Sequence, residues 1–263
     1  MFDLQAHRGG AGLAPENTLE AFANALEIGV STLECDVHVS ADGVPVLSHE
    51  RTFAGHLIAR RTAAELSPAP RLSDLVTLLR EQGADEVRLN IETKFDVLHP
   101  DEGAPRERFV ETVLQVLSSA GLLDRTSIQS FDWAVLRLVR AAEPRLSLNA
   151  ITNTGYLEVD QPGASPWLGG IDIDDFDDSV PAAVSALGFD AISPSHTILT
   201  PAMVAEAHDA GLQVIPYTVD APPSMRRLIE FGVDGMITNR PDVLRTVLAE
   251  MDVPLPRSYP RIA

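Results

Sequence analysis

Residues 32–49 read TLECDVHVSADGVPVLSH, a strand-like pattern that carries two carboxylates. Glu34 and Asp36 stand two apart in a run of β-branched and apolar residues, so in a strand both project to the same face. Such a pair repels itself unless a cation lies between the carboxylates. A turn at residues 41–43 then leads to a second short apolar run, which ends at His49. We therefore expect two carboxylates and a histidine at one edge of a sheet, as the centre of a metal site.

Strand-like and helix-like stretches alternate on both sides of this segment. Alternation of this kind predicts a parallel sheet, and eight units in 263 residues predict a closed (β/α)8 TIM barrel. An open, doubly wound sheet is the competing layout. The expected strands are 4–7, 32–49 with its return, 87–93, 126–130, 146–151, 190–193, 213–219 and 235–238. The expected helices are 18–28, 72–79, 106–120, 133–142, 201–210, 223–231 and 241–251.

The chain has no change of composition or linker that would divide it, so we expect a single domain. The barrel is predicted over residues 1–251, with residues 50–70 as a short cap after the second strand. Residues 153–180 are rich in Asp, Gly and Pro, and we expect a long irregular connection there that contains one doubtful strand at 170–173. The Pro-rich residues 252–263 are predicted to form an extended tail.

The charge balance is strongly acidic, with 20 Lys and Arg against 38 Asp and Glu and a formal net charge of −18. This balance argues against nucleic acid or an anionic membrane surface as the main partner. It still allows a small anionic substrate, because a bound metal and a few local cations can override the overall field. The expected partner is therefore a small molecule, and the oligomeric state is left open.

The single cysteine, Cys35, rules out a disulfide within the chain. It alternates with the two carboxylates along the strand and should face the packing helices, which favours a buried structural thiol over a nucleophile. No run reaches the ~18 apolar residues that a membrane span needs, and the first ten residues do not resemble a signal peptide. We therefore expect a cytoplasmic protein without stable membrane insertion.

Polar residues gather where successive strands end, which in a barrel is the location of the active site. They are His7 and Arg8 after the first strand, Glu34, Asp36 and His49 at the second, Glu92 and Lys94 at the third, Gln129 and Ser130 at the fourth, and Tyr217 and Thr218 at the seventh. The three carboxylates Glu34, Asp36 and Glu92 are hard oxygen donors that suit Mg²⁺ or Ca²⁺. Salt bridges to Arg8 and Lys94 are the alternative interpretation of the same acids.

Two of the seven histidines, His7 and His49, are predicted to flank the metal. Imidazole can serve as an acid or a base near neutral pH, so these two are the candidate catalytic pair. Two other interpretations concern neighbouring residues. Residues 9–12 read GGAG, but Pro15 replaces the third glycine of a dinucleotide-binding fingerprint, so that signal is weak. Lys94 could form the Schiff base of an aldolase, although Glu92 beside it favours a contact with phosphate.

An ordered set of segments resembles the glycerophosphodiester phosphodiesterases. These are His7-Arg8-Gly9, Pro15-Glu16-Asn17-Thr18, Glu34-x-Asp36, Val46-x-x-His49, Glu92-x-Lys94, Ser130-Phe131, Tyr217-Thr218-Val219, Gly232-Val233-Asp234-Gly235 and Thr238-Asn239-Arg240-Pro241. The resemblance runs from residue 7 to about 242 and is specific as a set. It departs from the usual family pattern at Glu50, where aspartate is usual, at Tyr217 and Asp220, where Trp and Asn are common, and in the short cap.

The resemblance implies a TIM barrel that hydrolyses glycerophosphodiesters to glycerol 3-phosphate and an alcohol. Glu34, Asp36 and Glu92 would hold the divalent cation, His7 and His49 would be the acid–base pair, and Arg8 and Lys94 would contact the phosphate. Tyr217 and the cap would shape the pocket for the alcohol. A glycerol hydroxyl would attack phosphorus to give a cyclic intermediate, which water then opens.

Two further functions are kept as alternatives. The first is a lysophospholipase D-type hydrolase of lysophospholipids, which an assay with lysolipid micelles would distinguish. The second is a non-catalytic, metabolite-binding barrel, which would bind its ligand tightly without turnover.

Overall fold

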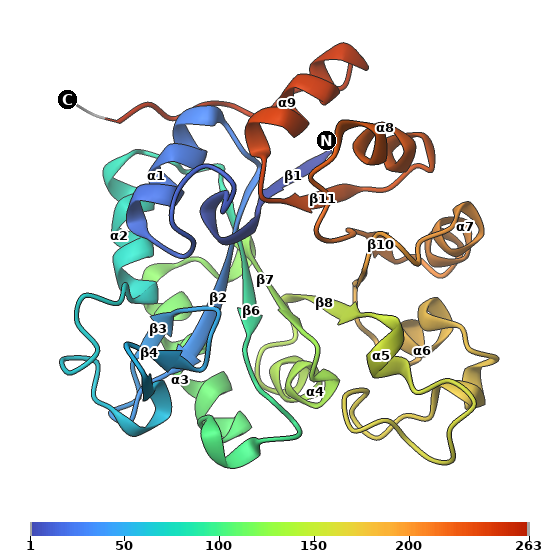
Figure 1. Ribbon diagram of the computed structural model, residues 1–263, viewed down its shortest axis with the longest axis horizontal. Helices are drawn as coiled ribbons and strands as arrows, with labels where there is room; N and C mark the ends of the chain where they lie inside the picture. The colour runs from blue at the N-terminus through green and yellow to red at the C-terminus, as the bar shows by residue number, and fades with distance from the viewer. Residues whose placement is uncertain (1, 262–263) are drawn as a thin grey trace.

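A computed structural model describes residues 2–261, and its centre is a ring of parallel strands. Helices surround the strands on the outside (Figure 1). Neighbouring strands follow the order of the chain around the ring, from β11 through β1 and β2 to β10, as in a TIM barrel. The strands are β1 (Asp3–Ala6), β2 (Thr32–Val39), β6 (Arg88–Thr93), β7 (Thr126–Ser130), β8 (Ser147–Thr152), β9 (Ala191–Pro194), β10 (Gln213–Val214) and β11 (Gly235–Thr238).

The ring is closed between β10 and β11 by backbone hydrogen bonds. The amides of Asp234, Ile237 and Val219 donate to the carbonyls of Val214, Pro216 and Ile237, each over 3.0 Å. The predicted strand 213–219 is regular only at Gln213–Val214. Pro216 has no N–H to donate to a neighbouring strand, so beyond β10 the regular ladder is replaced by isolated backbone hydrogen bonds. These bonds still place the ends of β10 and β11 side by side.

The helices between the strands pack their apolar faces on the ring. In α1, for example, Phe22 and Leu26 are fully buried and Thr18 caps the first turn by accepting from the Ala21 amide. Proline occupies the first turn of α7, α8 and α9, where its missing N–H costs nothing. The helices are α1 (Leu19–Ile28), α2 (Leu72–Glu81), α3 (Arg106–Ala120), α4 (Trp133–Ala142), α5 (Thr154–Leu157), α6 (Val180–Ala186), α7 (Pro201–Asp209), α8 (Pro222–Glu230) and α9 (Pro241–Glu250).

The segment after β2 forms a small antiparallel extension beside the ring. β3 (Pro45–Leu47) pairs with β2, and β4 (Thr52–Phe53) pairs with β5 (His56–Leu57). Val46, Ile58 and Leu66 form a small apolar cluster of their own under this segment. The cap therefore has a fixed shape and can position side chains over the end of the barrel.

The connection between β8 and α6 differs from the prediction at residues 170–173. The predicted strand at 170–173 is wrong, because Gly169 and Gly170 have positive φ angles of 65° and 88°, which break an extended strand. Asp172 then caps a 3₁₀ turn at Ile173–Phe176 by accepting from the Asp174 amide. α6 was not among the expected helices; its cap Ser179 accepts a hydrogen bond from the Ala182 amide. This helix completes the unit between β8 and β9.

The described part of the C-terminal segment, up to residue 261, contacts α1 at Tyr259. The Tyr259 amide donates to the Leu26 carbonyl over 2.8 Å, and the Tyr259 side chain is buried. Cys35 is fully buried, as predicted. Over residues 2–261, no helix combines the length and the apolar character needed to cross a membrane.

Candidate active site

Three carboxylates meet at the carboxyl end of the ring. β2 and β6 are parallel and adjacent, and their register sets Asp36 opposite Glu92, while Glu34 lies two residues before Asp36 on the same face. One oxygen from each of the three lies within 4.8 Å of the others, and all three side chains are buried. The convergence that the sequence predicted is therefore present in the structure.

Glu34 is held by donors from two sides. The backbone amide of Arg8 donates to Glu34 Oε2 over 2.8 Å. The side-chain amide of Gln129 donates to Glu34 Oε1 over 3.0 Å. Arg8 adopts a left-handed conformation, with φ 53°, in the turn after β1 where this bond forms. Burial, and then the neighbouring charges of Asp36 and Glu92, raise the pKa of Glu34. A cation bound beside this carboxyl would favour its ionised form.

Asp36 has one occupied and one free oxygen. Its Oδ2 accepts from Asn17 Nδ2 over 2.9 Å and lies 3.0 Å from Arg8 Nε. Its Oδ1 is buried without a hydrogen-bond partner in the described chain, and Lys94 Nζ is 3.5 Å away. Burial opposes ionisation, but Lys94 and Arg8 outweigh it and lower the pKa of Asp36. An ionised oxygen without a hydrogen-bond donor is available as a ligand.

Lys94 lies against the third carboxylate. Its Nζ donates to Glu92 Oε1 over 2.8 Å. Burial would lower the pKa of Lys94, but Glu92 and Asp36 outweigh that effect and raise it. The ammonium therefore stays charged, which suits a contact with an anion and does not suit the neutral amine that a Schiff base requires.

These residues fit a divalent cation. The donors are hard carboxylate oxygens, and the free Asp36 Oδ1 is the kind of buried orphan that a metal would satisfy. The three carboxylates outnumber the two cations, Arg8 and Lys94, by one negative charge. A divalent cation would leave one positive charge, which balances the single negative charge of a phosphodiester.

His7 follows β1 in a 3₁₀ turn at His7–Gly9. Its Nδ1 lies 2.7 Å from Oδ1 of Asn239, the residue after β11. Burial of the ring, followed by the charge of Arg8, lowers the pKa of His7 to about 4. The imidazole is therefore neutral at pH 7, and its Nε2 is able to accept a proton.

His49 stands after β3 and is more exposed. Its Nδ1 lies 2.8 Å from Glu50 Oε1, and its side chain retains 32% of its exposed area. The carbonyl of His49 accepts from His38 Nε2 over 3.3 Å, which ties the loop to β2. The hydrogen bond from His49 lowers the pKa of Glu50, so this glutamate is a charged partner when the histidine is protonated. The two histidines thus differ in their partners, a neutral amide for His7 and a carboxylate for His49.

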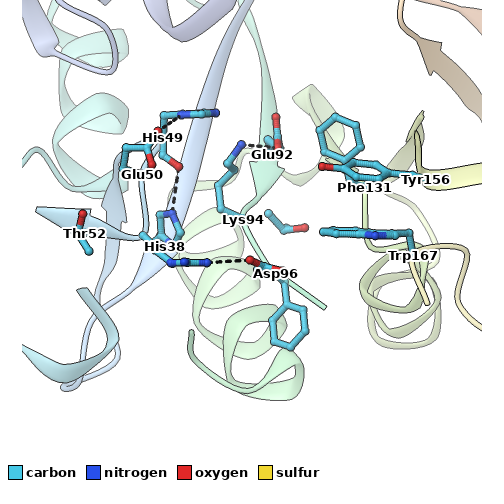
Figure 2. Close-up of a pocket in the computed structure, with 13 residues that line it drawn as sticks. His38, His49, Glu50, Thr52, Glu92, Lys94, Asp96, Phe131, Tyr156 and Trp167 are labelled. Atoms are coloured by element: carbon cyan, nitrogen blue, oxygen red, sulfur yellow. Dashed lines mark hydrogen bonds and ion pairs between the residues drawn. The ribbon is translucent and has the colours of Figure 1, made fainter. Parts of the chain in front are cut away.

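Two adjacent cavities share lining residues at this cluster. The inner one, about 170 Å³, is lined by His7, Arg8, His49, Glu92, Lys94, Gln129, Phe131, Ile151, Tyr217, Thr218 and Ile237. The outer one, about 590 Å³, shares His49, Glu92, Lys94 and Phe131 with it and opens toward the cap. Figure 2 shows Lys94 between a polar wall with His49 and His38 and an aromatic wall with Tyr156 and Trp167. A substrate with two unequal parts could span both cavities.

Tyr217 lies on the wall of the inner cavity. Its hydroxyl donates to the Thr152 carbonyl over 3.2 Å, and its ring packs edge-on against Phe131 at 5.8 Å. Burial raises the pKa of the Tyr217 hydroxyl, so it remains protonated. With Tyr217, the eight residues to which the resemblance gives a role lie at one end of the barrel.

Sequence reasoning missed the side chains that hold these residues. Thr18 caps α1, and Asn17 before it binds both the backbone amide and a carboxylate oxygen of Asp36. Asn239 and Asp220 behind it support His7. Asn17 and Asn239 stand within segments that carry the resemblance, and Asp220 is a position where the chain departs from it. Their roles depend on contacts between distant parts of the chain, which the sequence does not show.

The comparisons with known proteins agree with this geometry. Residues 7–243 match the model of the glycerophosphoryl diester phosphodiesterase family. The chain is 28% identical over 259 residues to the glycerophosphodiester phosphodiesterase of Caldanaerobacter subterraneus subsp. tengcongensis, covering 91% of this chain and 94% of that one. It is 25% identical to that of Bacillus altitudinis, over 95% of this chain and 100% of the relative.

Solved structures show the same fold. One from Silicibacter pomeroyi, assigned to the glycerophosphoryl diester phosphodiesterases, superposes with a TM-score of 0.82 at 32% identity and covers 97% of this chain and 95% of that chain. A phosphodiesterase from Oleispira antarctica in complex with sn-glycerol-3-phosphate superposes with a TM-score of 0.75 at 19% identity, over 94% and 96% of the two chains. On the match to the family model over nearly its whole length, the chain belongs to the glycerophosphoryl diester phosphodiesterase family.

Proposed function

We propose that this enzyme hydrolyses glycerophosphodiesters to glycerol 3-phosphate and an alcohol, with Mg²⁺ or Ca²⁺ held by Glu34, Asp36 and Glu92. The observation that carries the proposal is the meeting, at one end of the barrel, of this buried carboxylate cluster with two histidines that have different partners. When bound, the cation neutralises negative charge on the phosphate. Arg8 and Lys94 add two further positive charges at the same place.

The different sizes of the two cavities suggest how the substrate is oriented in the site. The glycerol part is common to all such diesters and suits the small inner cavity, with His7 and Tyr217 on its wall. The variable alcohol suits the larger outer cavity between the cap and Trp167. The phosphate then lies where the cavities meet, beside Lys94 and His49.

In the first step, His7 acts as the base. Its neutral Nε2 takes the proton of the glycerol 2-hydroxyl, whose oxygen bonds to phosphorus. The bond from phosphorus to the alcohol oxygen breaks, and His49, protonated and paired with Glu50, gives its proton to that oxygen. The products are a free alcohol and a cyclic glycerol phosphate, with His7 protonated and His49 neutral.

In the second step the two histidines exchange roles. His49 takes a proton from a water molecule, whose oxygen bonds to phosphorus and opens the ring. His7 returns its proton to the 2-oxygen as that oxygen leaves. Glycerol 3-phosphate is released, and both histidines are back in their starting states.

Phosphorus NMR of the reaction tests this proposal. With glycerophosphocholine and glycerophosphoethanolamine as substrates and Mg²⁺ or Ca²⁺ present, glycerol 3-phosphate should accumulate. A substrate analogue without the 2-hydroxyl should stay intact, because it lacks the nucleophile. Absence of glycerol 3-phosphate from a folded, metal-loaded enzyme would contradict the proposed function, and rapid hydrolysis of the analogue would contradict the cyclic route.

Lysophospholipids are the second candidate substrates, and the lining of the outer cavity indicates how well they would fit. Its aromatic wall could take an acyl chain, but the opposite wall carries Glu50, Arg51 and Asp96, whose charges would lose water beside a lipid. Lysolipid micelles should therefore be poorer substrates than water-soluble glycerophosphodiesters. A higher kcat/KM on lysolipid micelles would reverse this ranking.

Replacing Lys94 by methionine should change metal binding and catalysis in opposite directions. Loss of a positive charge 2.8 Å from Glu92 and 3.5 Å from Asp36 should strengthen binding of a divalent cation. Loss of the phosphate contact should lower kcat/KM by about 10- to 10²-fold. Metal titration followed by melting temperature, beside steady-state kinetics, would measure both. Weaker metal binding in Lys94→Met would contradict the assigned charge arrangement.

A further inference from the structure

We propose that Asp220, acting through Asn239, fixes the tautomer of His7, so that Nδ1 carries the proton and Nε2 is the catalytic base. Asp220 and Asn239 are then positioning residues, two links in a chain that ends at the reacting group. The inference rests on the proposed role of His7 as a base, but the chain of hydrogen bonds can be tested without any substrate.

The chain of contacts lies on the seam that closes the barrel. Val219, in the segment that follows β10, donates to the Ile237 carbonyl of β11 over 3.0 Å, which brings Asp220 close to the residues at the end of β11. Asp220 Oδ1 accepts from the backbone amide of Asn239 over 2.8 Å and from the Thr238 hydroxyl over 3.1 Å. The carboxylate is thus fixed by the same backbone that ends the strand.

The direction of each hydrogen bond follows from chemistry. An ionised carboxylate only accepts, so the Asn239 group 2.8 Å from Asp220 Oδ2 must be its NH₂. The amide oxygen of Asn239 then faces His7 Nδ1, at 2.7 Å. A carbonyl oxygen only accepts, so Nδ1 must carry the hydrogen. In a neutral imidazole this leaves Nε2 without a proton.

The amide between the two groups also keeps charge away from the histidine. A carboxylate in direct contact with Nδ1 would stabilise the imidazolium and raise the pKa of His7, so that more of the enzyme would already carry a proton on Nε2 before the reaction; the contact between Glu50 and His49 suits an acid for the same reason. Asn239, whose own amide is oriented by Asp220, accepts the hydrogen bond from His7 Nδ1. The negative charge of Asp220 is therefore separated from the His7 ring by the Asn239 side chain. His7, the proposed base, thus has a neutral amide as its partner, whereas His49, the proposed acid, has a carboxylate.

Asp220→Asn is the decisive variant because it changes hydrogen-bond polarity with almost no change in shape. The new side-chain amide at position 220 would keep its oxygen toward Thr238 and the Asn239 backbone, and its NH₂ would then face the NH₂ of Asn239. The Asn239 amide should turn over, present its NH₂ to His7 and shift the proton to Nε2. We expect kcat to fall by about 10- to 10²-fold, with KM little changed.

The double variant Asp220→Asn with Asn239→Asp should restore the original direction. The new carboxylate at position 239 would accept both from the new NH₂ at position 220 and from His7 Nδ1, so the neutral histidine should again carry its proton on Nδ1, and kcat should recover at a pH high enough to keep His7 neutral beside this charge. Asp234→Asn is the matched control, because Asp234 lies on the same seam at its other end, where it accepts from Val214 and His208.

Nitrogen NMR of ¹⁵N-histidine-labelled enzyme reads the tautomer directly. The wild type should show a protonated Nδ1 at His7, Asp220→Asn a protonated Nε2, and the double variant a protonated Nδ1 again. An unchanged tautomer in Asp220→Asn would overturn the inference, even if kcat fell. A wild type with this tautomer but no hydrolysis of any glycerophosphodiester would refute the proposed function while leaving the fixed tautomer in place.

Discussion

Replacing His7 by alanine is expected to lower kcat for glycerophosphodiester hydrolysis by about 10²- to 10⁴-fold, the range for loss of one acid–base group. The ring of His7 is held on the wall of the inner cavity, and its pKa of about 4 keeps it neutral at working pH. Alanine leaves no group there that can take the proton of the attacking hydroxyl. Release of glycerol 3-phosphate at saturating substrate and metal measures the effect.

His56→Ala is the control for this substitution, since His56 is an exposed histidine of the cap hairpin. Its kcat should match that of the wild type. Circular dichroism and melting temperature should show that both variants fold. A kcat within a few-fold of wild type in His7→Ala would mean that another group accepts the proton, and the assignment of His7 would be wrong.

Replacing Asp36 by asparagine should remove most of the binding of the divalent cation. Asp36 contributes the ionised oxygen that lacks a hydrogen-bond donor, and asparagine offers a neutral amide in its place. In the wild type, metal at 100 times its Kd should stabilise the fold by about 2.7 kcal/mol, and this gain should largely vanish in the variant. Activity at the same metal concentration should fall by at least about 10²-fold.

Melting curves with and without Mg²⁺ or Ca²⁺ separate metal binding from catalysis in this experiment. Asp209→Asn, an exposed aspartate at the end of α7, is the matched control and should retain the metal-induced gain in melting temperature. The metal-free melting temperature of Asp36→Asn reports any loss of stability from the changed contacts with Arg8 and Lys94. An Asp36→Asn enzyme that gains as much stability from metal as the wild type would exclude Asp36 as a ligand.

The positions of the three carboxylates were predictable because they depend on local geometry. Two-residue spacing in a strand sets Glu34 and Asp36 on one face whatever the rest of the chain does. The alternation of strands and helices makes β6 the parallel neighbour of β2, and Glu92 arrives at the same level through their register. The roles of these residues, and of the two histidines, stay predictions until the variants are measured.

The supporting side chains were not predictable because each depends on contacts across the barrel. Asn17 reaches Asp36 from the turn before α1, and Asp220 reaches Asn239 across the seam. The wrong strand at 170–173 has a local cause, since an apolar alternation did not outweigh two glycines with positive φ and the cap at Asp172. Likewise, Pro216 limits β10 to Gln213–Val214, where seven residues had been expected.

The sequence did not indicate which segments line the outer cavity, which is proposed to take the alcohol. The cap provides Glu50, Arg51 and Thr52 on one side, and Tyr156 and Trp167 come from the long connection 153–180, which was expected to be mostly irregular. The connection therefore lines the outer cavity. The expected cytoplasmic location stays a prediction.

Metal-dependent release of glycerol 3-phosphate from glycerophosphocholine and glycerophosphoethanolamine, measured with EDTA and after adding back Mg²⁺ or Ca²⁺, is the most direct test of the proposed site. Product formation should stop with EDTA and return with one of the two metals, which would also identify the cofactor. Turnover that resists chelation completely, in enzyme shown to be free of metal, would contradict the proposed metal site and leave Glu34, Asp36 and Glu92 without the role assigned to them.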